Sequence, residues 1–396
     1  MQRVAVQAQF RARKAVWHGT RIALLSRRRA VSCAAMITHE ALPAVVTVDW
    51  LKDRLGQVKL LDTSWYLPPM GRDAKNEFAA ARIPGAQFWD IDGVADPATD
   101  LPHMLPSEAA FAAAADALGI GNEDAVVVYD GMGMFAAPRA WWTWRVFGHS
   151  RVAVLEGGLP AWKAAGLELD ESAAGSEALT AATAAACAAS SSGSSKYKAK
   201  LMRDKVLSLH DMQQLVQPAA AAVAAGQAPP ALQRQVVDAR SAGRLHGIEP
   251  ELLHNCCSCT APKRPFPAGA IRHAAAVVDA RSAGRFAGLE PEPRPGLPSG
   301  HMPGSKNLPF TQVYEGGVMQ GGRLQPVDQL EALFQTAGVD PQAPLVASCG
   351  SGLTACVLAL ALHQVTGQLV PVYDGSWSEW AATPGAAIQK EEPAAQ

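Results

Sequence analysis

One cysteine of this chain lies in a setting that favours nucleophilic chemistry. The run 348–355, Ser-Cys-Gly-Ser-Gly-Leu-Thr-Ala, follows an apolar strand-like run and precedes the apolar, helix-forming stretch 356–363. Gly350 and Gly352 let the loop between them curl, so that successive backbone N–H groups point at one spot, where the helix dipole adds positive potential. Cys349 is therefore expected to be a thiolate that attacks sulfur and forms a persulfide whose charge the loop binds. The alternative is a small buried cysteine in a strand–helix turn.

The strands and helices that would position this loop occur twice. Short apolar runs alternate with helical patterns, which predicts an α/β fold with mainly parallel sheets flanked by helices. The same features recur in the same order, which predicts two tandem copies of one domain. The segments 60–62, 81–86, 126–129 and 152–162 correspond to 277–279, 300–305, 345–348 and 370–377.

We assign residues 41–170 to the first domain and residues 196–390 to the second. Between them, residues 171–195 are rich in Ala, Ser and Gly and have few large apolar side chains, so we expect a flexible linker without chemistry. Val236–Arg244 is identical to Val277–Arg285, and only the second copy runs on into a Gly-His-Met-Pro-Gly turn. Residues 236–276 are therefore interpreted as an insertion that loops out. In the competing interpretation, the first copy forms the strand of the domain and the second copy is displaced.

Residues 1–40 have the composition of an organelle transit peptide, because basic residues alternate with Ala, Val and Leu and no acidic residue precedes Glu40. A mitochondrial address is expected, with plastid or cytoplasm as alternatives, and a disordered basic tail is the competing interpretation. Arginines interrupt the apolar stretches, so this segment is not expected to span a bilayer.

The composition indicates small-molecule or protein partners. A formal net charge of −1 favours neither nucleic acid nor an anionic membrane. Seven unevenly spaced cysteines do not form a disulfide pattern, so a reducing compartment is expected.

The loop that begins at Cys349 resembles that of 3-mercaptopyruvate sulfurtransferases, members of the tandem-domain rhodanese family. The resemblance covers most of residues 41–385, apart from the linker and the insertion. Thiosulfate sulfurtransferases are similar but carry basic residues after the cysteine, where this chain has Gly350 and Ser351. The resemblance therefore implies 3-mercaptopyruvate rather than the thiosulfate dianion as sulfur donor. Other similar stretches are 62–68, 88–92, 103–106, 137–142 and 373–380.

The resemblance also implies roles for individual residues. Asp92, His103 and Ser351 match a set that would relay a proton to the leaving enolate of pyruvate. An N-cap aspartate and a surface histidine are the alternatives for the first two. Arg285 and Arg294 match substrate-binding arginines, which suit a 2-oxo acid with a carboxylate.

The other residues expected to bind substrate lie in the loop after Cys349. Arg281 could equally be a structural ion-pair partner. Arg244 is the counterpart of Arg285 in the first copy of the duplicated segment, but nothing there matches Arg294, which favours the second copy. The loop residues expected to bind substrate are Gly350, Gly352, Leu353 and Thr354.

The first domain has Asp130-Gly-Met-Gly-Met134 where a nucleophile loop would stand, so it cannot form a persulfide. We expect it to lend Asp92 and His103 to the cleft of the second domain.

The sequence thus predicts a sulfurtransferase that moves sulfur from 3-mercaptopyruvate through Cys349 to a thiol acceptor, such as thioredoxin or glutathione, or to cyanide, with no metal or organic cofactor. A thiosulfate:cyanide sulfurtransferase and a catalytically weak sulfur-carrier protein are the alternatives. Two other patterns are weaker: His254 with Cys256, Cys257 and Cys259 lacks the distant second ligand pair of a zinc site, and Ala355 stands where a phosphatase loop needs arginine.

Overall fold

The computed structural model describes residues 42–172, 180–188, 196–227, 275–318 and 322–391. From Pro43 onward the chain forms one compact unit. The predicted transit peptide lies outside the described residues, as does nearly all of the predicted insertion 236–276.

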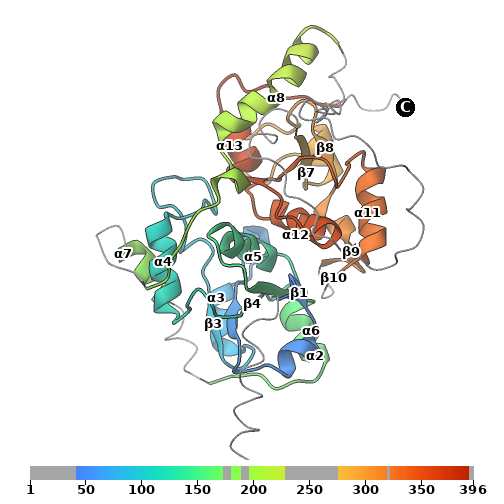
Figure 1. Ribbon diagram of the computed structural model, residues 1–396. Helices are drawn as coiled ribbons and strands as arrows, with labels where there is room; N and C mark the ends of the chain where they lie inside the picture. Colours follow the sequence, from blue (N-terminus) through green and yellow to red (C-terminus); the bar gives the residue numbers. More distant parts are fainter. Residues whose placement is uncertain (1–41, 173–179, 189–195, 228–274, 319–321, 392–396) are drawn as a thin grey trace, which may run out of the picture. The chain divides into compact units, whose positions relative to one another are not determined.

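The first half of the chain forms a parallel sheet of five strands in the order β1-β5-β4-β2-β3 (Figure 1). The central strand β4 is buried along its whole length, because helices cover both faces of the sheet and its β-branched residues suit a dry environment. The strands are β1 Val45–Val46, β2 Lys59–Asp62, β3 Ala86–Phe88, β4 Val126–Tyr129 and β5 Val152–Leu155.

Helices connect these strands. The loop after β4 leads into α5, whose side chains are nearly all buried, including three tryptophans. The helices of this half are α2 Val48–Lys52, η1 Pro68–Met70, α3 Ala74–Ala80, α4 Glu108–Ala117, α5 Ala137–Val146 and α6 Gly158–Ala164.

The second half repeats this topology, with a five-stranded parallel sheet in the order β6-β12-β11-β7-β8. The predicted fold class, two tandem α/β domains, is therefore confirmed. The strand β7, Ala276–Asp279, lies next to β11 and is formed by the second copy of the duplicated segment, so the interpretation that gave this strand to the first copy is wrong. The other strands are β6 Val206–Leu207, β8 Lys306–Asn307, β11 Leu345–Ser348 and β12 Val372–Tyr373, with the antiparallel pair β9 Tyr314–Glu315 and β10 Arg323–Leu324.

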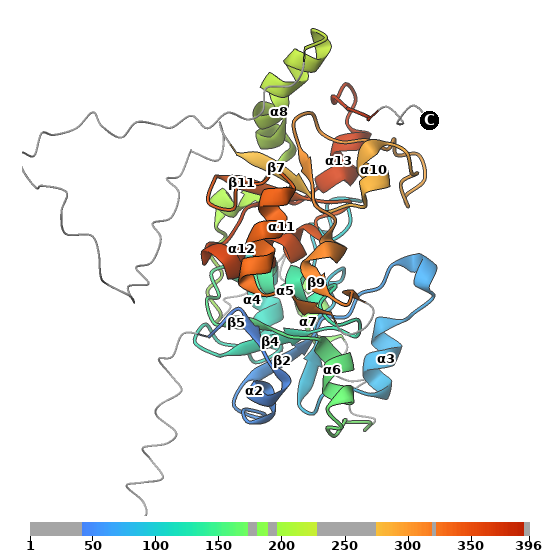
Figure 2. The ribbon, with the colours of Figure 1, turned by 90° about the vertical axis from the view of Figure 1, so that its right-hand side faces the viewer.

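The helix α12 follows β11 and lies beside α5 in both ribbon views (Figures 1 and 2). Trp142 of α5 donates from its indole nitrogen to the carbonyl of Val370 at 3.3 Å, so apolar packing and a buried hydrogen bond join the two halves here. The helices of the second half are η3 Arg203–Lys205, α8 Leu209–Ala224, α10 Ala283–Ala287, η4 Phe310–Val313, α11 Val327–Thr336, α12 Ala355–Thr366 and α13 Ser376–Ala382.

The expectation of a flexible linker over 171–195 is wrong for its middle part, where α7 spans Ala181–Ala188. Alanine is the best helix former, and Ala182 and Ala186, one turn apart, bury their small faces in the core that also holds the alanines of α4. Low side-chain volume therefore permits close helix packing here.

The segment that follows the linker packs on the first half. The backbone N–H groups of Lys196 and Tyr197 donate to the Asp116 carboxylate at 2.6 and 2.8 Å, and the Met202 N–H donates to the Val146 carbonyl at 2.7 Å. The second sheet starts only at Val206. The start of the second domain therefore lies later in the chain than the predicted residue 196.

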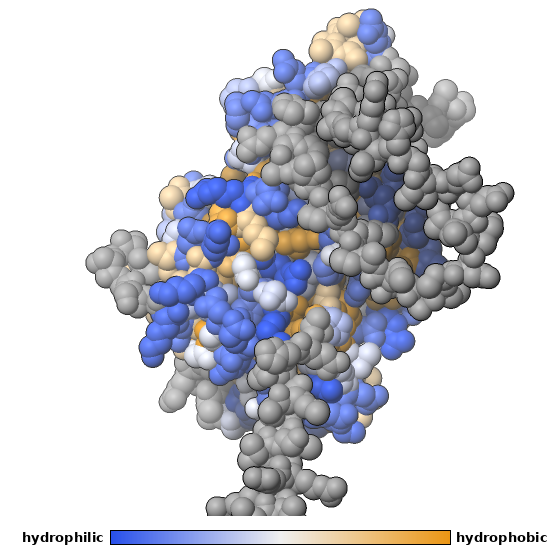
Figure 3. All heavy atoms as spheres, in the orientation of Figure 1, coloured by the Kyte–Doolittle hydropathy of each residue, from blue (hydrophilic) through white to orange (hydrophobic). Residues whose placement is uncertain are grey.

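The face of the molecule seen in Figure 3 is hydrophilic over much of its described surface, with apolar residues showing between the polar ones. Within the described ranges, no helix combines the length and the apolar character that crossing a membrane requires.

Candidate active site

Cys349 directly follows β11 and is buried, with 1% of its surface exposed. Its backbone is fixed on both sides by the segment that begins α13. The Cys349 N–H donates to Ser376 Oγ at 3.2 Å, and its carbonyl accepts from the Trp377 N–H at 3.0 Å. The sulfur therefore stands on a rigid support at the carboxyl end of a central strand.

Two serines that the sequence analysis did not single out hold this loop. Ser376 adopts a left-handed backbone conformation, with φ of 50°, and its hydroxyl donates to the Tyr373 carbonyl at 2.8 Å. Ser378 donates to the Gly350 carbonyl from its hydroxyl at 2.6 Å and from its N–H at 2.9 Å. Ser376 is the serine of the Asp-Gly-Ser-Trp stretch, and Ser378 directly follows it. The resemblance of this stretch to the family was the only sequence signal, and it assigned neither serine a role.

The loop leaves a row of backbone donors free. Among the described residues, the N–H groups of Gly350 to Thr354 make no hydrogen bond. Leu353 is buried and Thr354 caps α12, so these donors precede a helix N-terminus. Gly352 is required here, because φ is +78° and a Cβ would stand 2.6 Å from the Asp374 carbonyl oxygen. The arrangement is suited to holding an anion.

The two predicted substrate arginines lie beside this loop. A Cβ placed on Gly350 would stand 3.0 Å from Arg285 Nη2 and 4.0 Å from Arg294 Nη1. Burial and the nearby Arg285 charge lower the pKa of Arg294, while the charges of Cys349 and Asp92 act in the opposite direction. Both guanidinium groups are thus within reach of an anionic substrate at Cys349.

Glu292 positions one of these arginines and was missed from the sequence. Its side chain is 3% exposed and accepts from Arg281 at 2.8 Å and from Arg285 at 2.5 Å. Arg281 also pairs with Asp279 at 2.7 Å and is fully buried, which agrees with its interpretation as a structural ion-pair partner. Glu292 is the second glutamate of a Glu-Pro-Glu stretch that shows no recognisable site pattern, so only the structure identifies its role.

Asp92 and His103 are in contact. His103 Nδ1 and Asp92 Oδ1 are 2.5 Å apart, and the indole nitrogen of Trp65 donates to Asp92 Oδ2 at 2.7 Å. Partial burial raises the pKa of Asp92, but the hydrogen bonds from His103 and Trp65 and the charges of His103 and Arg294 outweigh it, so this pKa lies below its usual value. His103 is not a surface residue, since it is 3% exposed.

Ser351 is not joined to this pair. It is mostly buried, but it shares no hydrogen bond with His103 within the described part of the chain, and His103 Nε2 has no hydrogen-bond partner there. The structure therefore assembles the Asp92–His103 pair and leaves the predicted contact to Ser351 unmade.

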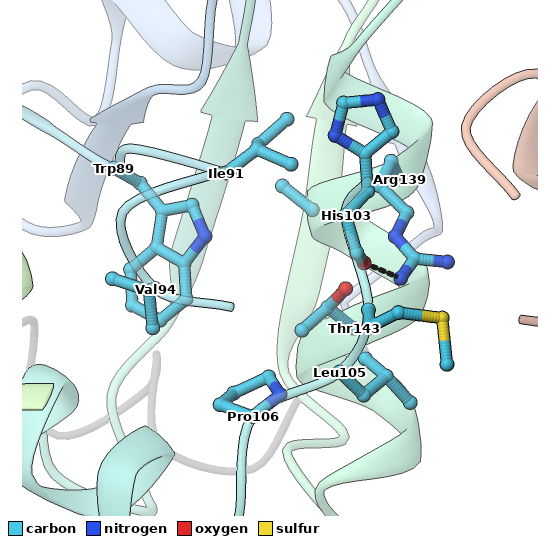
Figure 4. Close-up of a pocket in the computed structure, with 10 residues that line it drawn as sticks. Trp89, Ile91, Val94, His103, Leu105, Pro106, Arg139 and Thr143 are labelled. Carbon is cyan, nitrogen blue, oxygen red and sulfur yellow. Dashed lines mark hydrogen bonds between the residues drawn. The ribbon is translucent and has the colours of Figure 1, made fainter. Parts of the chain in front are cut away.

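A small cavity of about 10 Å³ lies behind His103, lined by side chains that include Trp89, Pro106 and Thr143 (Figure 4). The carbonyl of His103 faces Arg139 there, while its imidazole ring points the other way (Figure 4). A space of this size holds about one water molecule, so it is not a substrate site.

Within the described ranges, no group of three or more His, Cys, Asp or Glu side chains could hold a metal ion. The crowded residues His254 to Cys259 lie outside those ranges.

The model of the rhodanese-like domain matches this chain twice, over residues 47–165 and 268–383. The chain belongs to the rhodanese family. It is 39% identical, over 88% of its length and 78% of the relative, to thiosulfate/3-mercaptopyruvate sulfurtransferase 1, mitochondrial, of Arabidopsis thaliana. It is 37% identical to thiosulfate/3-mercaptopyruvate sulfurtransferase 2 of the same plant, over 97% of this chain and 96% of that protein.

A solved structure extends this rhodanese assignment to the whole fold. SseA from Escherichia coli, described as a 3-mercaptopyruvate sulfotransferase with the rhodanese fold, has a TM-score of 0.58 and 28% identity. The match covers 84% of this chain and 98% of that one. The tandem arrangement predicted from the internal repeat is thus also found in a relative that is matched over nearly its whole length.

Proposed function

We propose that this protein is a sulfurtransferase that takes sulfur from 3-mercaptopyruvate and carries it as a persulfide on Cys349. The observation that supports this most directly is the buried sulfur at the end of β11, next to free backbone N–H groups and two guanidinium groups. Such a site stabilises a thiolate and then a persulfide anion. Both Arabidopsis relatives carry this activity in their names.

The donor is inferred from the arginines and from Gly350. Arg285 and Arg294 offer planar forks to a carboxylate and a neighbouring keto oxygen. A Cβ at position 350 would stand 3.0 Å from Arg285 Nη2. Glycine at this position therefore leaves room for the guanidinium. A basic side chain here would crowd Arg285 and add charge better matched to a dianion.

In the proposed first step, the Cys349 thiolate attacks the sulfur of 3-mercaptopyruvate. An S–S bond forms, the C–S bond breaks, and its electron pair passes to the carbon, giving the enolate of pyruvate and Cys349 persulfide. The enolate takes one proton and leaves as pyruvate. We assign the supply of this proton to His103, held by Asp92, with Ser351 as intermediary once substrate draws the two together.

In the second step, a thiol acceptor such as thioredoxin or glutathione, or cyanide, takes the outer sulfur and restores the thiolate. The basic, acid-free segment 1–39 supports a mitochondrial location for this reaction. One of the two plant relatives is named mitochondrial.

Thiosulfate is the second candidate donor, because the two plant relatives are named for both donors and the paired arginines would also attract a dianion. The ratio of rates on the two donors separates them. We expect 3-mercaptopyruvate to be preferred.

The test is steady-state pyruvate release from 3-mercaptopyruvate with a thiol acceptor, for the full chain, for Cys349→Ser and for a chain lacking residues 236–274, a deletion that keeps Ala275 and the whole of β7. We expect full activity in the first and third and none above background in the second. A full chain as inactive as Cys349→Ser would contradict the proposed enzyme. Recovery by the deletion alone would assign the defect to the duplicated segment and leave a sulfur-carrier role for the full chain.

A further inference from the structure

The guanidinium of Arg139, in α5, connects the two halves of the molecule at the site. Nη1 donates to the Gly352 carbonyl, in the nucleophile loop, at 3.3 Å. Nη2 donates to the His103 carbonyl and to Asp374 Oδ1, the latter at 2.6 Å. The side chain is 1% exposed. One rigid, planar group therefore fixes the loop of the nucleophile relative to the backbone of the histidine.

Asp374 completes this arrangement from the second half. Its Oδ1 pairs with Arg139, and its Oδ2 accepts from the Leu105 N–H at 2.9 Å. The turn at His103 is therefore held at two points, its own carbonyl by Arg139 and the N–H two residues later by Asp374.

This turn needs to be held. His103 has a φ of +61°, a left-handed conformation that costs a non-glycine residue on the order of 1 kcal/mol and persists only where the surroundings enforce it. The conformation directs the carbonyl at Arg139 and lets the ring meet Asp92. Without the two bonds, the turn would relax and the ring would leave its position beside Asp92.

Stability alone does not explain the buried ion pair between Arg139 and Asp374. Asp374 is 5% exposed, so both charges are removed from water, and buried ion pairs of this kind are often no more stabilising than apolar side chains. Although burial by itself lowers the pKa of Arg139, the charge of Asp374 raises it, so the guanidinium stays charged. What an apolar pair could not supply is a set of directional bonds to both His103 and Gly352.

We propose that Arg139 and Asp374 are positioning residues for the reaction, which hold the strained turn at His103 in register with the Cys349 loop so that the enolate receives its proton. This inference rests on the proposed function. It assigns the first half of the chain an active part in the second half's chemistry, through a buried pair rather than through contact with substrate.

The test is a double-mutant cycle on pyruvate release, using Arg139→Lys and Asp374→Asn, each alone and combined with His103→Ala. We expect kcat to fall about 10- to 100-fold for each single variant, with KM changed less than about threefold, because the cost is misplacement of the proton donor. In the His103→Ala background, the same changes should cost less than about threefold. Arg82→Lys is the matched control, since Arg82 is equally buried and pairs with Asp170 inside the first half only.

Each outcome of the double-mutant cycle either supports or overturns the positioning role of Arg139 and Asp374. Equal losses with and without His103 would mean that the pair does not act through the histidine, and unchanged kcat would mean that it does not act at all. Either result overturns the inference, as does loss of the folded state, by circular dichroism, in both pair variants. A full chain that matches Cys349→Ser in the same assay instead contradicts the proposed function, so the two failures are distinguishable.

Discussion

Asp130 occupies the place in the first sheet that Cys349 occupies in the second. Each residue follows the last residue of the central strand, since Tyr129 pairs with Asp62 and Ser348 pairs with Asp279 in the same register. The Asp130 carboxylate accepts the N–H groups of Met132, Ala136 and Ala137, each at 2.8 Å. The loop of the first half is therefore an anion site that is filled by its own side chain, whereas the corresponding donors after Cys349 make no hydrogen bond within the part of the chain that the structure describes.

Asp130→Ala should destabilise the protein strongly, because it leaves three buried N–H groups without an acceptor. Each such group costs about 1 kcal/mol or more, so a loss of about 3 kcal/mol is expected. Burial raises the pKa of Asp130, so the neutral isostere Asp130→Asn should cost less. Thermal melting of the three proteins checks this order, and equal melting of Asp130→Ala and the unmodified chain would contradict it.

Glu292→Gln should impair both stability and substrate binding. The buried Arg281 and the partly exposed Arg285 would lose their shared carboxylate, and breaking a buried ion pair such as Arg281–Glu292 costs about 3 kcal/mol. Because Arg285 is freed from its anchor, the KM for 3-mercaptopyruvate should rise about 10-fold.

The matched control for this change is Glu290→Gln, since Glu290 is exposed and its carboxylate bonds to Ser282 at 3.0 Å. It should melt and turn over like the unmodified chain. A Glu292→Gln protein that shares both properties would show that Glu292 does not position Arg285.

Asp92→Asn should lower kcat about 10- to 100-fold while leaving KM nearly unchanged. The carboxylate orients His103 through a charge-assisted hydrogen bond, which an amide does not provide, and general acid catalysis contributes at least this much. Steady-state rates from pH 5 to 9 give the test, with Asp96→Asn, a change in the same loop, as control. A loss confined to KM would mean that Asp92 binds substrate instead.

The sequence predicted those features that depend on local pattern. Buried runs such as Val126–Tyr129 read as central strands, because only a strand covered on both faces tolerates continuous β-branched residues. The repeat then predicted the tandem fold, and the Cys-Gly-Ser-Gly loop pointed to Cys349 as the proposed nucleophile. The resemblance matched Asp92, His103 and Ser351 to one set, and the structure brings only the first two into contact.

The remaining features depend on contacts between distant segments. Arg139 and Asp374 are far apart in the chain and meet only because α5 packs on α12, so no spacing reveals them. The sequence of α7 resembled a linker because its alanines have little apolar surface to bury. They pack nonetheless, because their partner is another alanine-rich helix. The contact of His103 with Ser351 depends on side-chain positions, which the resemblance alone did not determine.

The last prediction concerns Asp62, a carboxylate that lacks the arginine partner of its counterpart Asp279. Asp279 pairs with Arg281, two residues later. The corresponding Asp62 accepts from the N–H and hydroxyl of Ser64, at 2.9 and 2.5 Å, and from the Tyr129 side chain, but within the described part of the chain it pairs with no arginine. Burial raises the pKa of Asp62 to about 6, against 3.8 for the free side chain. The folded state thus holds a proton on Asp62 that the unfolded chain loses at lower pH.

It follows that the contribution of Asp62 to stability is fully present below about pH 4 and is lost as the pH rises through 6, by about 3 kcal/mol in total at neutral pH. Asp62→Asn is neutral throughout, so it should be more stable than the unmodified chain at pH 7.5, and this difference should fall to roughly a third at pH 4.5. Melting curves of both proteins at pH 4.5, 6 and 7.5 measure the difference. A difference that does not change with pH would show that ionisation of Asp62 is not its cause.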